Sequence, residues 1–176
     1  MDISSVKQLA LAIELVVFDV DGVFTDGRIS INHQGEETKT FNVRDGHGVR
    51  MLMHYGVDVA VLSGRESKAV TVRMHELGIS TVMQGHIDKR AALTELIQEK
   101  HLANEQVAFV GDDIIDVPAM QMSGLSFAVS DAHPWVIRHA HHTTAARGGH
   151  GAVREVCELI MDAKGLLEKA LQHNVQ

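Results

Sequence analysis

Two carboxylates follow a short apolar run near the start of the 176-residue chain. The run at residues 15–18 ends at Asp19, and Asp21 and Gly22 come directly after it. A carboxylate can attack phosphorus, and a second one nearby can protonate the leaving oxygen and later activate water. The glycine permits the sharp turn that brings both carboxylates to the entrance of one site. A calcium-type loop, the alternative interpretation, needs several further oxygen ligands, and only Asp26 follows.

Ser63, Gly64 and Lys89, which follow later in the chain, could hold a phosphate group. Ser63 and Gly64 directly follow an apolar run at 57–62. The serine hydroxyl and the backbone amides at the start of the next helix can donate hydrogen bonds to phosphate. Lys89 lies where a helix is expected to begin. The helix dipole disfavours a cation at this position unless the cation has an anionic partner. Among carboxylates and phosphate, Lys89 would neutralise charge and orient the nucleophile. Each signal alone also fits an ordinary helix cap or a surface lysine.

An acidic group follows the apolar run at 106–110. Asp112, Asp113 and Asp116 occur within five residues there. Magnesium takes hard oxygen ligands and uses only one or two carboxylates, so Asp112 could complete a Mg²⁺ site with Asp19 and the backbone carbonyl of Asp21. An acidic helix N-cap is the alternative, but a cap does not require three aspartates.

The elements that must position these residues alternate between strand-like and helix-like patterns. We expect strands at 15–18, 57–62, 80–83, 106–110 and 126–129, and helices at about 6–13, 46–55, 66–77, 88–101, 114–122 and 151–171. This alternation predicts an α/β fold with a doubly wound, mostly parallel, Rossmann-like sheet. The carboxyl ends of its strands then bring the motifs to one edge. The length suits a single domain over residues 1–176.

One segment interrupts the alternation directly after the first strand. Residues 27–43 contain two extended stretches, 28–31 and 36–43, around a turn with Gly35, which predicts a β-hairpin. The hairpin and the predicted helices and strands fill the spacing between the motifs, so we expect no cap domain. Because an isolated two-stranded ribbon is marginally stable, the hairpin is a candidate subunit contact.

The composition excludes several classes of protein. With 16 basic and 23 acidic residues the net charge is −7, which argues against a nucleic-acid partner but not against an anionic substrate. No apolar run is long enough for a membrane helix and no signal peptide is evident, so we expect a cytoplasmic protein. Cys157 is the only cysteine and lies on an apolar helical stripe, where a buried structural thiol is expected.

The four motifs, in this order and each at a strand end, resemble those of the haloacid-dehalogenase superfamily from about residue 15 to 155. The resemblance implies Asp19 as nucleophile, Asp21 as acid/base, Ser63, Gly64 and Lys89 as phosphate-binding residues, Asp19, Asp21 and Asp112 as Mg²⁺ ligands, and Asp113 and Asp116 as their support.

Finer features are similar to one capless family within it, the 3-deoxy-D-manno-octulosonate 8-phosphate phosphatases of lipopolysaccharide synthesis. They are DVDGVFTDG at 19–27, VRDGHG at 43–48, LSGR at 62–65 with Arg73, and GGHGAVRE at 148–155. That resemblance implies a homotetramer joined through its hairpins, with each site roofed by a neighbour. It also implies that Arg65 and Arg73 bind a sugar-acid carboxylate, with Asn42 and Arg44 as further candidates. Arg73 could equally be an ordinary helix-surface arginine.

Several alternatives remain open at the level of sequence. A nine-carbon substrate such as N-acylneuraminate 9-phosphate shares the carboxylate and the terminal phosphate. A phosphoaspartate signalling module and an inactive relative serving as an interaction module are rivals of other classes. Gly148 and Gly149 could shape the site or form the turn before the last helix. His139, His141 and His142 have no cysteine or carboxylate among them, so we expect solvated side chains rather than a metal site.

Overall fold

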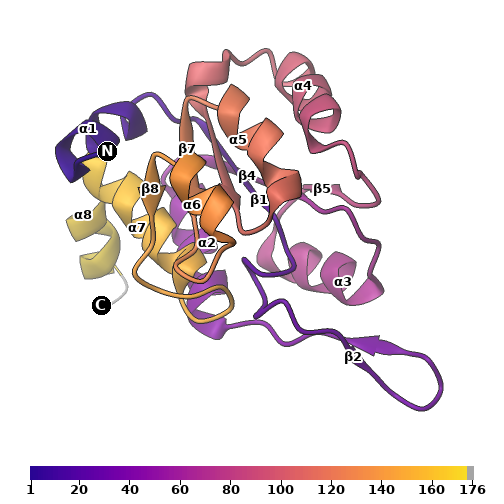
Figure 1. The fold of residues 1–176 in the computed structure, drawn as a ribbon. Coiled ribbons are helices and arrows are strands. Elements are labelled where there is room, and N and C mark those ends of the chain that lie inside the picture. Colours follow the sequence, from indigo (N-terminus) through magenta and orange to yellow (C-terminus); the bar gives the residue numbers. More distant parts are fainter. Residues whose placement is uncertain (174–176) are drawn as a thin grey trace.

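The computed structural model describes residues 1–173, which form a six-stranded sheet between two layers of helices (Figure 1). The strand order is β5-β4-β1-β6-β7-β8, and all five pairings are parallel. The strands are β1 (Leu15–Phe18), β4 (Asp58–Leu62), β5 (Thr81–Met83), β6 (Val107–Gly111), β7 (Leu125–Ala128) and β8 (His142–Thr143). The predicted α/β class and the five predicted strands are confirmed; β8 was not predicted.

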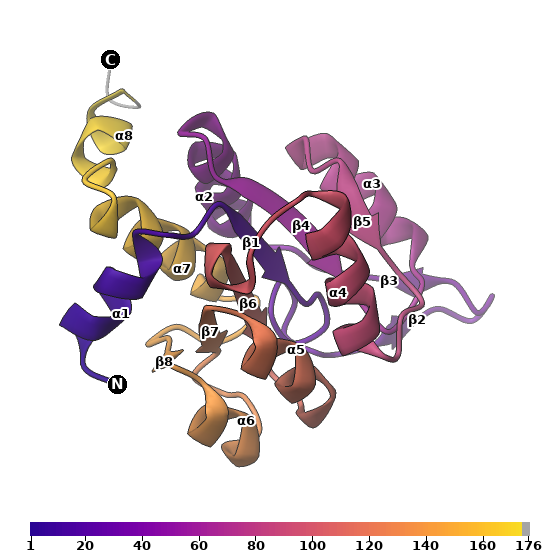
Figure 2. The ribbon, with the colours of Figure 1, turned by 90° about the horizontal axis from the view of Figure 1, so that it is seen from above.

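The helices cover both faces of this sheet (Figure 2). One layer contains α1 (Ile3–Ala10), α2 (Val43–His54), α3 (Lys68–Leu77) and α7 (Ala152–Ala163), with α8 (Leu167–His173) beyond α7. The other contains α4 (Lys89–Glu99), α5 (Val117–Met122) and α6 (Pro134–His139), with the short 3₁₀ turns η1 (Asn104–Gln106) and η2 (Ile114–Asp116). Right-handed crossovers require this division, because the chain moves outward from β1 in one direction and from β6 in the other. No helix within residues 1–173 is long and apolar enough to cross a bilayer.

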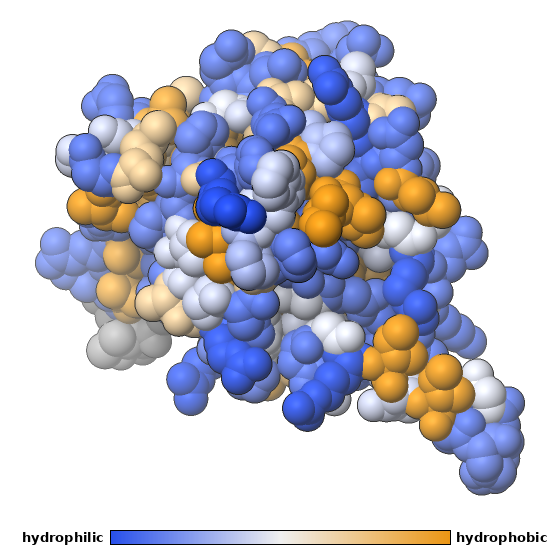
Figure 3. Space-filling model, viewed as in Figure 1, coloured by the Kyte–Doolittle hydropathy of each residue, from blue (hydrophilic) through white to orange (hydrophobic). Residues whose placement is uncertain are grey.

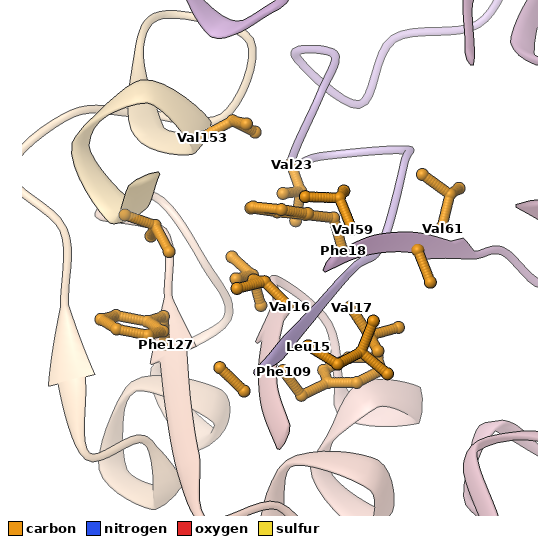
Figure 4. Packing of buried hydrophobic residues seen from close by; sticks show 14 of the residues in the cluster. Leu15, Val16, Val17, Phe18, Val23, Val59, Val61, Phe109, Phe127 and Val153 are labelled. Carbon is orange, nitrogen blue, oxygen red and sulfur yellow. The ribbon is translucent and has the colours of Figure 1, made fainter. Parts of the chain in front are cut away.

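The core lies along the two central strands (Figure 4). Every residue of β1 is fully buried, as are Phe109 of β6 and Phe127 of β7. Phe18 meets Phe24 of the following loop edge to face, with ring centroids 5.3 Å apart. Burial on both faces explains why β1 is a continuous apolar run rather than an alternating one. The loop that leaves β1 is therefore anchored in the core at its start.

The sheet reverses its winding direction between β1 and β6. The chain passes from β1 to β4 on one side and from β6 to β7 on the other. Phe18 is level with Val110, and the amide of Asp19 donates to the carbonyl of Val110 at 3.0 Å. A crevice for ligands is expected outside the carboxyl ends of two strands that diverge in this way. The motifs after β1 and β6 both open into it.

The hairpin is present but has a shorter ladder than the sequence predicts. It pairs only β2 (Ser30–Ile31) with β3 (Glu37–Thr38) and projects from the body of the molecule (Figure 1). The predicted second strand at 36–43 is wrong beyond Thr38, because Asn42 caps α2 by accepting from the amide of Arg44 at 2.9 Å. Helix α2 consequently begins at residue 43 instead of 46.

The helix predicted at 151–171 is two helices, α7 and α8. Gly165 separates them with φ +68°, a left-handed conformation that favours glycine and ends a helix. At the other end of the chain, α1 starts earlier than predicted because Asp2 accepts from the amide of Ser5 at 2.9 Å. Helix α6 was not predicted as an element; it begins at Pro134, whose fixed φ suits the first turn of a helix.

The start of α7 depends on a residue from α2. Its N-cap is Gly151, which has no side chain to satisfy the first amides. The fully buried carboxylate of Asp45 accepts from the amides of Gly151 at 3.2 Å and Arg154 at 2.8 Å. Asp45 therefore ties α2 to α7, a contact for which the sequence carries no local signal.

We expect Asp45→Ala to lower the free energy of unfolding by about 2 kcal/mol, because two buried N–H groups lose their acceptor. Asp2→Ala removes the exposed cap of α1 and should cost about 1 kcal/mol or less. Equilibrium urea unfolding measures both. Equal losses in the two variants would contradict the cross-helix role of Asp45.

Candidate active site

A buried lysine lies at the centre of the crevice. The side chain of Lys89, the first residue of α4, is fully buried. Its Nζ lies 2.7 Å from Oδ1 of Asp19 and 2.5 Å from Oδ1 of Asp116. Burial, the largest effect, lowers the pKa of Lys89, but the two carboxylates outweigh it and raise the pKa overall. The lysine therefore stays charged and holds the carboxylate of Asp19 in one orientation.

Asp116 is fully occupied by protein partners. Its Oδ1 accepts from Lys89, and its Oδ2 accepts from the amides of Asp112 at 3.0 Å and Asp113 at 3.1 Å. A Cβ on Gly111 would lie 2.5 Å from the Cβ of Asp116, so only glycine fits at that position. Asp116 thus positions both Lys89 and the loop that carries Asp112. This is the kind of supporting role that the family resemblance implies for Asp116.

Asp112 has an oxygen with no protein partner. Its Oδ1 is buried and makes no hydrogen bond with any described residue. Burial, reinforced by Asp19 and Asp116, raises the pKa of Asp112 to about 8. Burial and Asp116 likewise raise the pKa of Asp19 to about 6, against the opposing effect of Lys89.

These carboxylates fit a hard divalent cation. Oxygens of Asp19, Asp112 and Asp116 lie within 4.8 Å of one another. A buried carboxylate oxygen without a partner, beside like charges, is stabilised by a cation that takes oxygen ligands. Because both oxygens of Asp116 already accept hydrogen bonds from the protein, Asp19 and Asp112 are better placed than Asp116 to hold such a cation.

Ser63 and Gly64 lie at the same edge of the sheet. Phe18 is level with Val61, so the residues that follow β1 and β4 emerge side by side. Ser63 is buried, its amide donates to the carbonyl of Met83 at 2.9 Å, and its Oγ accepts from the amide of Arg65 at 3.2 Å. The hydroxyl proton of Ser63 remains available to an anion.

Glycines let three loops meet around Asp19. A Cβ on Gly22 would lie 2.0 Å from Oδ2 of Asp112, and one on Gly148 would lie 1.7 Å from the carbonyl oxygen of Gly22. The amide of Gly149 also donates to the carbonyl of Val23 at 2.9 Å. The glycine pair therefore shapes the loop after β1 and also forms the turn before α7, so both interpretations left open by the sequence hold.

The hairpin brings two charged residues that the sequence analysis missed, Lys39 and Glu37, close to Asp21. Lys39 forms ion pairs with Asp21 and Glu37, and its side chain is only 2% exposed. Arg65 pairs with Glu37 and places its Nε 3.6 Å from Oδ2 of Asp21. A signal existed, because the alternation after Gly35 sets Lys39 on the same face as Phe41.

The remaining sequence candidates have other surroundings. Arg73 pairs with Glu76 at 2.7 Å and lines an open groove of about 750 Å³ between β3 and α3, which Glu37 and Lys39 also line. Asn42 caps α2 and donates to the carbonyl of Gly149 at 3.2 Å, so its side chain is already engaged.

Two predicted candidates are exposed. The side chain of Arg44 forms no hydrogen bond or ion pair with residues 1–173. Asp113 only caps η2, through the amide of Ile114 at 2.7 Å, although its own amide joins the Asp116 network.

The histidines gather no metal site among the residues described, but His139, His141 and His142 are not fully solvated as predicted. His141 is half-buried, and its Nδ1 accepts from the amide of Ser126 at 3.0 Å. Burial lowers the pKa of His141, consistent with that acceptor role. His139 and His142 are also half-buried, the latter in β8. Cys157 is buried as expected, which raises the pKa of its thiol.

Comparisons with known proteins agree with this geometry. A family model of haloacid dehalogenase-like hydrolases matches residues 62–156. The 3-deoxy-D-manno-octulosonate 8-phosphate phosphatase KdsC of Yersinia pestis is 50% identical over 165 residues, which are 94% of this chain and 88% of that protein. The chain belongs to the haloacid dehalogenase-like hydrolases.

Solved structures of other haloacid dehalogenase-like proteins match nearly the whole chain. A probable YrbI family phosphatase from Pseudomonas syringae pv. phaseolica has a TM-score of 0.97 at 46% identity, covering 98% of each chain. The 3-deoxy-D-manno-octulosonate 8-phosphate phosphatase of Moraxella catarrhalis, solved with magnesium, phosphate and KDO, has a TM-score of 0.96 at 37% identity, covering 99% of this chain and 100% of that one.

The raised pKa values of Asp19 and Asp112 predict how pH and metal affect stability. Both carboxyls bind protons more tightly in the folded than in the unfolded state, so without metal stability falls as pH rises from about 4 to 8. Mg²⁺ binds the ionised forms, so at 100 times its Kd we expect a Tm rise of roughly 5–10 °C at pH 8 and a smaller one at pH 6.

Thermal melts of the wild type and Asp112→Asn, with EDTA or Mg²⁺, measure this effect. The variant should melt higher than the wild type in EDTA at pH 8 and lose most of the Mg²⁺ response. The wild type and Asp112→Asn contain the same histidines, so the effect of histidine titration on Tm cancels when the two are compared. An undiminished Mg²⁺ response in Asp112→Asn would contradict the assignment of this ligand.

Proposed function

We propose that this chain hydrolyses 3-deoxy-D-manno-octulosonate 8-phosphate to the free sugar acid and phosphate. The observation that carries the proposal is the buried Asp19, held by Lys89 beside the free oxygen of Asp112. The name of the 50% identical Yersinia pestis relative supports the choice of substrate. The reaction would serve lipopolysaccharide synthesis in the cytoplasm, as the sequence resemblance implies.

The reaction has two steps on two carboxylates. In the first, a carboxylate oxygen of Asp19 attacks phosphorus, the bond to the sugar oxygen breaks, and Asp21 gives that oxygen a proton. In the second, Asp21 takes a proton from water, which attacks phosphorus and releases phosphate from Asp19. The contact with Lys89 keeps Asp19 in a single orientation through both steps.

The residues that bind phosphate lie just after β4 and at the start of α4. The hydroxyl of Ser63, the amide of Gly64 and the ammonium of Lys89 supply donors and positive charge to the transferring group. A magnesium ion held by Asp19, Asp112 and the backbone carbonyl of Asp21 would offset charge on the phosphate oxygens. Magnesium bound to the Moraxella catarrhalis protein supports this choice of metal.

Arg65 and Arg73 are assigned to recognition of the sugar acid. Arg65 is about half-exposed and pairs with Glu37, which lines the groove, and Arg73 lines the groove from α3. A guanidinium binds a carboxylate with two parallel hydrogen bonds, so either arginine suits the acid group of the substrate. Asn42 and Arg44 are weaker candidates, since one is engaged in capping and the other is exposed.

The test is phosphate release in Mg²⁺ from the eight-carbon substrate and from N-acylneuraminate 9-phosphate. Asp19→Asn should lower kcat by roughly 1,000-fold or more, because the nucleophile is lost. Asp58→Asn, which alters an exposed carboxylate at the opposite end of β4, should stay near the wild type. Residual activity in Asp19→Asn close to that of the control would refute the nucleophile.

The other outcomes separate the remaining candidates. Preference for the nine-carbon substrate would keep the mechanism and change the substrate. Release from neither substrate, together with a long-lived phosphoaspartate, would favour the signalling module. Release from neither without phosphorylation would favour an inactive relative.

We further propose that the chain forms a homotetramer through its hairpins. Ile29 and Ile31 are 50% and 65% exposed and lie next to a two-residue ladder that is too short to be stable alone. The projecting hairpin shows hydrophobic surface in the space-filling view (Figure 3). Burying these side chains against other copies would stabilise the ribbon and bring a neighbour close to the groove.

Ile31→Asp should therefore lower the mass in solution from about four times 19.2 kDa toward that of the single chain. The physical reason is that a carboxylate cannot be buried there without a partner. Light scattering after size exclusion measures the mass, and Leu11→Asp on α1, which also alters an exposed apolar residue, is the control. An unchanged mass in Ile31→Asp would place the subunit contact elsewhere.

A further inference from the structure

Lys39 is a nearly buried cation next to the catalytic loop. It follows β3, yet its side chain is only 2% exposed, because it turns from the hairpin toward Asp21. Its Nζ pairs with Oδ1 of Asp21 and lies 3.3 Å from Oε1 of Glu37. An ammonium removed from water needs anionic partners, and both of these partners are carboxylates.

The contact makes the two oxygens of Asp21 different. Oδ1 is taken by Lys39, whereas Oδ2 is buried and has no hydrogen-bond partner among the described residues. Arg65 comes closest to Oδ2 with its Nε, but 3.6 Å is too long for a hydrogen bond. One oxygen is therefore anchored, and the other keeps its hydrogen-bonding capacity unused within the described residues.

Glu37 holds the anchor in place from the far side. Its Oε1 faces Lys39 and its Oε2 pairs with Arg65, so one carboxylate lies between both cations that approach Asp21. Lys39 is consequently fixed between two carboxylates rather than swinging on a flexible stem. The hairpin thus reaches the acid/base through one rigid contact.

We propose that Lys39 is a positioning residue that orients Asp21 so that Oδ2 faces the leaving oxygen of the substrate. This inference rests on the proposed function. As the bond from Asp19 to phosphorus forms and the bond to the sugar oxygen breaks, the proton of Asp21 passes from Oδ2 to that oxygen. Lys39 keeps its protons throughout and touches neither substrate nor metal.

The proposal predicts an effect that depends on the leaving group. An alkyl oxygen must receive a proton to leave, whereas the phenolate of p-nitrophenyl phosphate leaves without one. A lysine that only stabilised the fold would affect both esters equally. The value of kcat/KM covers the steps up to loss of the leaving group, so it isolates the step in which Asp21 is the acid.

The experiment compares Lys39→Met with the wild type on the eight-carbon sugar-acid phosphate and on p-nitrophenyl phosphate. We expect kcat/KM to fall roughly 100-fold for the sugar ester, since general acid catalysis contributes at least that much, and less than about threefold for the aryl ester. Lys39→Arg, which keeps the charge and the contact, should recover most of the loss.

Lys100→Met is the matched control, because Lys100 also pairs with an aspartate, Asp58 at 2.9 Å, but far from the site. It should match the wild type on both esters. Equal losses on the two esters in Lys39→Met, or no loss on either, would overturn the inference while leaving the proposed function intact. A wild type inactive on the sugar ester would overturn the proposed function and the inference together.

Discussion

The burial of Lys89 between Asp19 and Asp116 is the interaction on which the site depends. Three aspartates converge where the sheet reverses direction, and this lysine supplies the only positive charge buried among them in the described chain. Burial, together with the remaining excess of negative charge, raises the pKa of Asp112, and one of its oxygens has no hydrogen-bond partner among the described residues. The same imbalance that costs stability without metal creates the affinity for a cation.

Loop packing converts this charge arrangement into a rigid site. Gly22 and Gly148 have no space for a side chain, so the loops after β1 and before α7 meet backbone to backbone. Asp45 fixes the start of α7 and hence the end of that second loop. A contact between two helices at the edge of the sheet thereby supports the orientation of the nucleophile loop.

The hairpin joins the interior of the site to the outer surface. Lys39 and Glu37 connect its base to Asp21, while Ile29 and Ile31 lie exposed farther along the ribbon. A ribbon with only two paired residues on each strand owes its position to these contacts at its base. Assembly through the exposed end would therefore bear directly on Asp21, the proposed acid/base.

The sequence by itself determined the α/β class, the five main strands and the cluster of Asp19, Lys89 and Asp112, because buried runs and their end residues follow local patterns. Tertiary structure decided the partners of Asp45 and Lys39. It also assigned Asn42 to a helix cap and bonded His141 to Ser126. These contacts join side chains from separate elements, and their energy depends on distance and burial rather than on neighbouring residue types. No local periodicity records such a pairing, so it becomes visible only when the sheet brings its loops together.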